Sequence, residues 1–125
     1  MGKAGGRIIQ LLNNVEIIAL SDISETNLNK AAAEFRIKAR YKNYQDMLEK
    51  EKLDAVYIAT PDNYHTNLII DSFNAGCHIL VERPMTTSQG DAEEVNRVVQ
   101  QTCKKFQINF NHRWRSLYHK IKEMI

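Results

Sequence analysis

Three short polar clusters stand where apolar stretches of the chain end, and their side chains can donate and accept hydrogen bonds. The clusters are Thr60-Pro61-Asp62-Asn63-Tyr64-His65, Glu82-Arg83-Pro84 and Asn111-His112-Arg113-Trp114. If the apolar stretches are strands of one parallel sheet, the clusters meet at its carboxyl edge, where open α/β sheets bind ligands. Each cluster alone also fits an ordinary role: a packing or solvent histidine, an ion pair closed by a proline, and a polar loop with an aromatic anchor. Their joint placement favours a binding site.

Two further candidates lie nearer the start of the chain. Glycine-rich turns let backbone N–H groups approach a pyrophosphate, and Gly2, Gly5 and Gly6 form such a cluster. The cluster lacks the full G-x-G-x-x-G spacing, so an irregular start of the chain is an equally good interpretation. Asp22 follows Gly2 by about 20 residues, where a carboxylate can bind the adenosine ribose hydroxyls and repel a 2′-phosphate. Asp22 therefore favours NAD over NADP, although it can also cap a helix.

Alternating apolar runs and amphipathic stretches predict the elements that position these residues. β-branched apolar runs are typical of strands covered on both faces, as in parallel sheets. Apolar residues spaced by three and four after a Ser or Asn predict capped helices. Strands are predicted at 15–20, 38–41, 54–60, 77–81 and 107–111. Helices are predicted after the caps Ser24, Asn43 and Ser88, over 63–75 with Gly76 as its left-handed cap, and over 115–125.

This alternation predicts an α/β fold with a doubly wound, mostly parallel, Rossmann-like sheet in a single domain, residues 1–125. The first strand of that fold is missing or shortened, because only Met1–Ala4 would be left to form it. The first helix is expected within Gly6–Asn13. An alternative is a strand at Arg7–Leu12, joined to the strand at 15–20 by a tight Asn-Asn turn.

Composition excludes several classes of protein. The 17 Lys+Arg and 15 Asp+Glu residues give a net charge of +2, spread along the chain, which argues against a nucleic-acid partner. The longest apolar run, Ala55–Ala59, is far shorter than the ~20 residues that span a bilayer, and the first residues lack a secretory signal. Cys77 and Cys103 have no metal-binding spacing. We therefore expect a cytoplasmic protein with reduced thiols, no metal and no membrane contact.

The order and spacing of the three polar clusters resemble the amino-terminal half of the Gfo/Idh/MocA family. This family comprises the glucose–fructose oxidoreductase, inositol dehydrogenase and rhizopine catabolism proteins, and the resemblance runs from about Val15 to Ile125. It implies an NAD(P)-binding domain of an oxidoreductase that transfers hydride between a nicotinamide and the carbinol carbon of a sugar or polyol. In such enzymes a second domain, absent from this sequence, supplies the catalytic histidine and much of the substrate pocket.

The resemblance also implies roles for individual residues. Arg83 replaces the lysine that usually stands between the glutamate and the proline of the second cluster, and that proline often follows a cis bond. A guanidinium stays charged at neutral pH, so Arg83 is a weak candidate for catalysis and a better one for hydrogen bonding to a hydroxyl. The residues expected to bind the cofactor are Gly2, Gly5, Gly6, Asp22, Thr60, Pro61, His65, Glu82, Arg83, Pro84, Asn111 and Arg113.

Other interpretations remain open at this point. A non-catalytic nucleotide-sensing or protein-interaction module would use the crevice or an unpaired sheet edge, which would also allow a homo-oligomer. A gene remnant without an independent role is a third interpretation. Because the first strand and the glycine pattern are incomplete, we expect the chain alone to bind its cofactor weakly or not at all. Losing a few charge-assisted hydrogen bonds moves a micromolar site toward the millimolar range.

Overall fold

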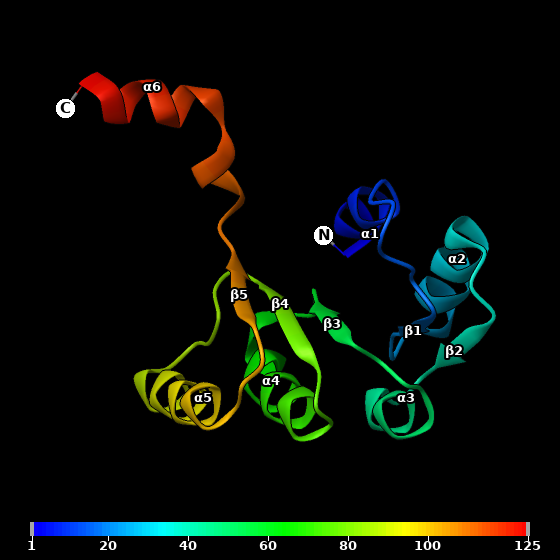
Figure 1. The fold of residues 1–125 in the computed structure, drawn as a ribbon. Helices are drawn as coiled ribbons and strands as arrows, with labels where there is room; N and C mark the ends of the chain where they lie inside the picture. The colour runs from blue at the N-terminus through cyan, green and yellow to red at the C-terminus, as the bar shows by residue number, and fades with distance from the viewer. Residues whose placement is uncertain (1, 125) are drawn as a thin grey trace. The chain divides into compact units, whose positions relative to one another are not determined.

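The computed structural model describes residues 2–124, in two compact units, Met1–Asp54 and Ala55–Ile125 (Figure 1). That the whole chain makes one domain stays a prediction. The first unit contains α1 (Gly2–Ile9), β1 (Ala19–Ser21), α2 (Glu25–Phe35), β2 (Ala39–Tyr41) and α3 (Tyr44–Lys50). The second contains β3 (Ala55–Ile58), η1 (Asp62–Tyr64), α4 (His65–Asn74), β4 (His78–Glu82), α5 (Gln89–Gln101), β5 (Phe106–Asn109), η2 (Asn111–Trp114) and α6 (Ser116–Met124), where η marks a 3-10 helix.

All strand pairs in the described residues are parallel, which confirms the predicted α/β class. In the first unit β1 pairs with β2, and in the second the strand order is β3-β4-β5. In chain order, β1 and β2 correspond to the second and third strands of a Rossmann fold, and β3, β4 and β5 correspond to the fourth, fifth and sixth. Residues 2–124 contain no strand before β1, in agreement with the prediction that the first strand of the fold is missing or shortened.

The helices of the first unit begin where side-chain caps were predicted. Ser24 accepts a hydrogen bond from the Asn27 amide at 3.4 Å and starts α2, whose buried residues include Leu28 and Phe35. Asn43 accepts one from the Gln45 amide at 2.9 Å and starts α3. Each cap satisfies an amide that the first turn of a helix leaves without a partner.

The start of the chain differs from its prediction. Helix α1 spans Gly2–Ile9 instead of lying within Gly6–Asn13, and the alternative strand at Arg7–Leu12 is wrong, because its first three residues are helical. The glycines lie inside α1 rather than in a turn before it. A Cβ atom at Gly6 would lie 2.8 Å from the Phe35 ring, so this glycine lets α1 approach α2 closely.

Strand β1 is shorter than the predicted strand at 15–20, since only Ala19–Ser21 form a ladder. Val15 and Ile18 are 45% and 39% exposed. A strand is defined by hydrogen bonds to its neighbours, and β1 has only the three-residue β2 beside it within the described residues. The apolar pattern of residues 15–20 predicted a longer strand, but the described residues contain no neighbouring strand that extends the β1–β2 ladder.

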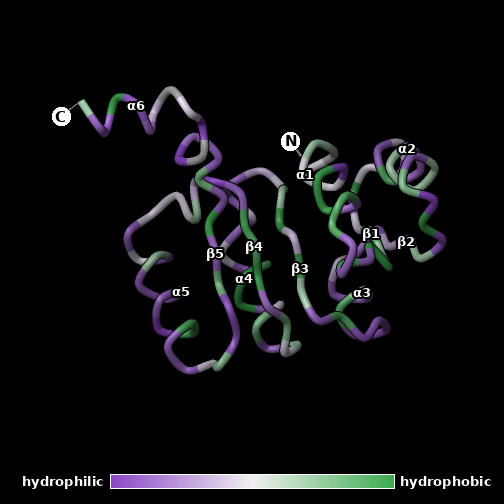
Figure 2. Tube along the Cα trace, turned by 45° about the horizontal axis from the view of Figure 1, so that its top comes forward, coloured by the Kyte–Doolittle hydropathy of each residue, from purple (hydrophilic) through white to green (hydrophobic). Residues whose placement is uncertain are grey.

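In the second unit, β4 lies between β3 and β5, and helices cover one face of the sheet. Helix α4 packs against β3 and β4, and α5 packs against α4 (Figure 1). The core between these layers includes the fully buried Ile69 and Val81 and the ring pair Phe73–Phe106, whose centroids are 5.8 Å apart. Hydrophobic residues follow the middle of β4, whereas α5 is mostly hydrophilic (Figure 2).

Both ends of the helix predicted at 63–75 have a defined geometry. Its first turn is the short η1, and α4 begins at His65. Gly76 has φ +81° and follows the last turn, as predicted, and its amide donates to the Phe73 carbonyl at 2.9 Å. The left-handed conformation at this position is inexpensive only for glycine.

The last helix, α6, extends away from the sheet of its unit (Figure 1) and contacts mainly η2, a short element that the sequence did not predict. Tyr118, Ile121 and Met124 remain exposed on it. The predicted end of this helix, Ile125, lies outside the described residues. None of the helices in residues 2–124 is both long enough and apolar enough to cross a bilayer.

Candidate functional site

The carboxyl ends of β3, β4 and β5 form one edge of the second unit's sheet, because these three strands are parallel neighbours in register. Ile58 pairs with Val81, and Glu82 pairs with Asn109. The three predicted polar clusters follow directly, so the structure brings them to the same edge. Thr60, Pro61, Arg83, Pro84, Asn111 and Arg113 are all exposed there.

His65 lies beneath this edge and contacts two of its loops. Its side chain is buried, with 1% exposure, and Nδ1 lies 2.8 Å from the Pro84 carbonyl oxygen while Nε2 lies 2.9 Å from that of Thr60. Carbonyl oxygens only accept, so both contacts are hydrogen bonds at once when both ring nitrogens carry hydrogen. The ring thus joins the loop after β3 to the loop after β4. Direct contact between His65 and a cofactor stays a prediction.

Glu82 is the centre of a hydrogen-bonded cluster across three strands. Its carboxylate Oε1 accepts from the Tyr57 hydroxyl at 2.5 Å and from Asn109 Nδ2 at 2.9 Å. Oε2 is buried and has no hydrogen-bond partner among the described residues. Tyr57 and Asn109 were not among the predicted site residues. The alternation of side chains along a strand is the signal that indicates them once the strands are paired. Tyr57 pairs with Leu80, whose side chain points to the same face as that of Glu82, and Asn109 pairs with Glu82 itself.

The cluster predicts how stability depends on alkaline pH. Burial, followed by the hydrogen bond to Glu82, raises the pKa of Tyr57 above the ordinary value of 10.0. A raised pKa in the folded state means that the contribution of the cluster is fully present below pH 10 and is lost as the pH rises above it. In urea unfolding between pH 8 and about 11.5, we expect the free energy of unfolding to fall less steeply in Tyr57→Phe than in the unchanged chain. Equal slopes would contradict this.

The Arg83–Pro84 peptide bond is cis, as the family resemblance implies. Arg83 and Pro84 directly follow the last residue of β4, the middle strand of the second unit's sheet, and so lie at its carboxyl end. Arg83 is exposed, which leaves its guanidinium available to a ligand at this edge.

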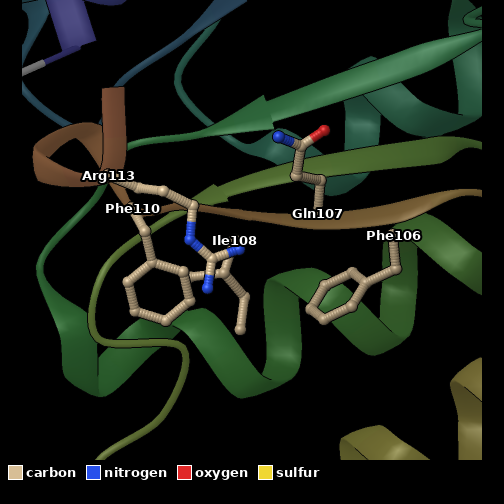
Figure 3. Close-up of a pocket in the computed structure, with 5 residues that line it drawn as sticks. All are labelled: Phe106, Gln107, Ile108, Phe110 and Arg113. Atoms are coloured by element: carbon tan, nitrogen blue, oxygen red, sulfur yellow. The ribbon is translucent and has the colours of Figure 1, made fainter. Parts of the chain in front are cut away.

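An open depression of about 430 Å³ runs along β5 (Figure 3) and is lined by Phe106, Gln107, Ile108, Phe110 and Arg113. The Arg113 guanidinium lies over the Phe110 ring, 5.8 Å from its centroid. A guanidinium against an aromatic ring keeps its outer N–H groups free to donate. Arg113 therefore places a positive donor just beyond the carboxyl end of β5.

In the first unit, Asp22 directly follows β1. Its amide donates to the Tyr41 carbonyl at 3.2 Å, and its Oδ1 accepts from the Ser24 amide at 2.8 Å. The side chain is half-buried, and Oδ2 accepts no hydrogen bond within the described part of the chain. Asp22 thus helps to start α2 and still presents one carboxylate oxygen. The ribose role predicted for it, and the pyrophosphate role of the three glycines, stay predictions.

The parallel strand order and the polar carboxyl edge define the class of this protein as a Rossmann-type dinucleotide-binding domain. Residues 1–110 match the oxidoreductase family with an NAD-binding Rossmann fold, and the chain belongs to this Gfo/Idh/MocA family. The expected family and fold class are therefore confirmed.

Relatives and solved structures agree with this assignment. The chain is 26% identical over 128 residues to myo-inositol 2-dehydrogenase of Thermotoga maritima. It superimposes with a TM-score of 0.89, at 24% identity over 98% of its length, on scyllo-inositol dehydrogenase of Lactobacillus casei, solved with bound NAD(H) and scyllo-inositol. An NAD-binding protein of Listeria innocua gives a TM-score of 0.88 at 33% identity, over 99% of this chain. The chain covers 37%, 36% and 36% of these three proteins, respectively.

Proposed function

We propose that this chain is the cofactor-binding part of an oxidoreductase that transfers hydride between a nicotinamide cofactor and the carbinol carbon of a sugar or polyol. The observation that carries the proposal is the meeting of three polar clusters at the carboxyl edge of β3, β4 and β5. The family membership and the inositol dehydrogenases among its relatives support the reaction class and the polyol substrate. The exposed Cys103 is a free thiol, which suits the reducing cytoplasm.

The exposed groups of this edge fit the hydrogen-bonding groups of a dinucleotide. The Thr60 hydroxyl and the guanidinium groups of Arg83 and Arg113 donate, and the Asn111 amide both donates and accepts. We infer that Thr60 and Pro61 lie along the cofactor, and that Asn111 and Arg113 lie toward its nicotinamide end. The nicotinamide supplies the hydride chemistry when it is bound. Arg83 orients a ribose or substrate hydroxyl and carries no proton, because its guanidinium stays charged.

In the other unit, we infer that the Asp22 carboxylate accepts hydrogen bonds from the adenosine ribose, with NAD as the preferred cofactor. Gly2, Gly5 and Gly6 are the remaining candidates for the pyrophosphate, through α1. Glu82 also remains a candidate for cofactor binding, and its buried carboxylate contacts Tyr57 on β3 and Asn109 on β5.

NADH titration followed by ¹⁵N-resolved NMR tests the proposal. We expect saturable shifts, with a Kd on the order of millimolar, at the amides of residues 60, 62, 83, 85–86 and 111–113. Residues 75–77 and 104–105, at the opposite edge of the same sheet, serve as the internal control. Arg83→Ala should weaken binding, whereas Arg83→Lys keeps a cationic donor and should bind as the unchanged chain does. Shifts confined to the opposite edge, or none at all, would contradict the proposal.

A further inference from the structure

The ring of His65 lies between two hydrogen-bond acceptors. Its Nδ1 is 2.8 Å from the Pro84 carbonyl oxygen, and its Nε2 is 2.9 Å from the Thr60 carbonyl oxygen. A neutral imidazole carries hydrogen on one ring nitrogen only, and the other nitrogen is an acceptor. In the neutral ring, one of the two contacts would therefore bring two acceptors together at hydrogen-bond distance. Only the imidazolium form, with hydrogen on both nitrogens, satisfies both carbonyl oxygens.

The surroundings of His65 offer its ring no other polar partner. The residue is 1% exposed, so a water molecule cannot readily take the place of either carbonyl. The titratable and charged groups near the carboxyl edge, on the segments packed against the start of α4, are Tyr57, Asp62, Tyr64, Glu82, Arg83 and Asp91. In the described part of the chain, none of these six forms a hydrogen bond or an ion pair with the ring. The two carbonyl dipoles alone therefore stabilise the charge of the imidazolium.

The proton of this ring determines how two loops are held. Thr60 belongs to the loop after β3, and Pro84 belongs to the loop after β4. Histidine is the side chain whose charge ordinarily changes between pH 5 and 8. Since the contacts favour the charged ring, their contribution is fully present at low pH and is lost as the pH rises through the titration of His65.

We propose that His65 is a positioning residue whose proton controls the cofactor-binding edge. The imidazolium form holds the loops after β3 and β4 in one arrangement, and loss of the ring proton releases one of them. Because these loops carry Thr60 and Arg83, the form with a released loop binds the cofactor more weakly. The effect on the cofactor rests on the proposed function, whereas the effect on the loops does not.

An NMR titration of the full chain between pH 5 and 8 tests the effect on the loops. Long-range ¹H–¹⁵N spectra of the imidazole report the protonation of both ring nitrogens of His65. Order parameters of the ¹⁵N amides at residues 60, 62, 85 and 86 report loop motion, and hydroxide does not accelerate them as it does amide exchange. As the ring loses its proton, we expect them to fall in at least one loop from about 0.85, typical of rigid backbone, toward about 0.6.

His78 serves as an internal control in the same spectra, because its ring contact depends on protonation in the opposite sense. His78 Nδ1 accepts from the Lys105 amide at 2.9 Å, so a proton on that nitrogen removes the contact. We therefore expect the order parameter of Lys105 to fall on acidification, while those of the two loops rise.

Two variants separate His65 from other titrating groups. His65→Gln is neutral at every pH, so its loop order parameters should not depend on pH. His119→Ala removes an exposed histidine of α6 and should keep the pH profile of the unchanged chain. A pH-dependent loop change that persists in His65→Gln would overturn the proposal. A His65 ring whose charge stays the same from pH 5 to 8, or loops that do not respond to its titration, would overturn it as well.

NAD⁺ titrations at both ends of this pH range test the effect on the cofactor. We expect Kd to be about fivefold higher when His65 is neutral, because apparent affinity falls with the fraction of molecules whose loops are held. Saturating NAD⁺ should in turn move the titration of His65 to higher pH, since such coupling is reciprocal. A loop change without any NAD⁺-dependent shift would refute the proposed function and leave the control of the loops standing. NAD⁺ binding with the same Kd for both forms of His65 would refute its positioning role and leave the function standing.

Discussion

Replacing His65 with alanine should lower the free energy of unfolding by about 3 kcal/mol. The change removes a fully buried ring and leaves a cavity, and such truncations cost a few kcal/mol. It also removes the groups that face the Thr60 and Pro84 carbonyl oxygens at 2.9 and 2.8 Å, and an unsatisfied carbonyl costs about 1–3 kcal/mol unless water replaces the donor. Urea unfolding monitored by circular dichroism measures the loss.

His119→Ala is the matched control, because this histidine is exposed on α6 and its loss should change stability by less than about 0.5 kcal/mol. Amide exchange at residues 60, 62 and 85–86 provides the second readout. If His65 joins the two loops, both should exchange faster in His65→Ala under conditions where the chain remains folded. A stability loss similar to that of the control, or unchanged loop exchange, would show that the ring does not hold these loops.

The position of His65 shows where reasoning from sequence was sufficient and where it was not. The pattern placed this histidine in the first turn of a helix after a buried strand, and α4 does begin there. Its two contacts were not predictable, because the Pro84 carbonyl belongs to a loop 19 residues further along the chain. The same limit applies to Tyr57 and Asn109, whose shared partner Glu82 is brought to them only by strand pairing.

Short-range sequence patterns were sufficient to predict most of the helices and strands. Caps at Ser24, Asn43 and Ser88 depend on side chains within three residues of the amides that they bind, and each was predicted. The length of β1 and the bounds of α1 were missed, and both elements contact neighbours that the local sequence does not describe. For β1 this neighbour is a pairing strand, and for α1 it is the Phe35 ring against Gly6.

Asp22→Ala should weaken NADH binding by about tenfold or more. Hydrogen bonds donated to a charged acceptor contribute about 1.5–3 kcal/mol, and 1.4 kcal/mol corresponds to a factor of ten in Kd. The alanine variant alone is ambiguous, because Asp22 Oδ1 also accepts the Ser24 amide and helps to start α2. Its effect on NADH therefore needs to be separated from its effect on the local turn.

Asp22→Asn separates these two roles. The amide oxygen of asparagine can still accept from the Ser24 amide at 2.8 Å, whereas the negative charge is gone. We expect this variant to keep the amide exchange of Ser24 and the stability of the first unit. We also expect the ratio of NADPH to NADH affinity to rise, because a carboxylate repels a 2′-phosphate and a neutral amide does not. NMR titrations with both cofactors measure this ratio. Unchanged affinities for both cofactors in both variants would remove Asp22 from the ribose site and confine it to the start of α2.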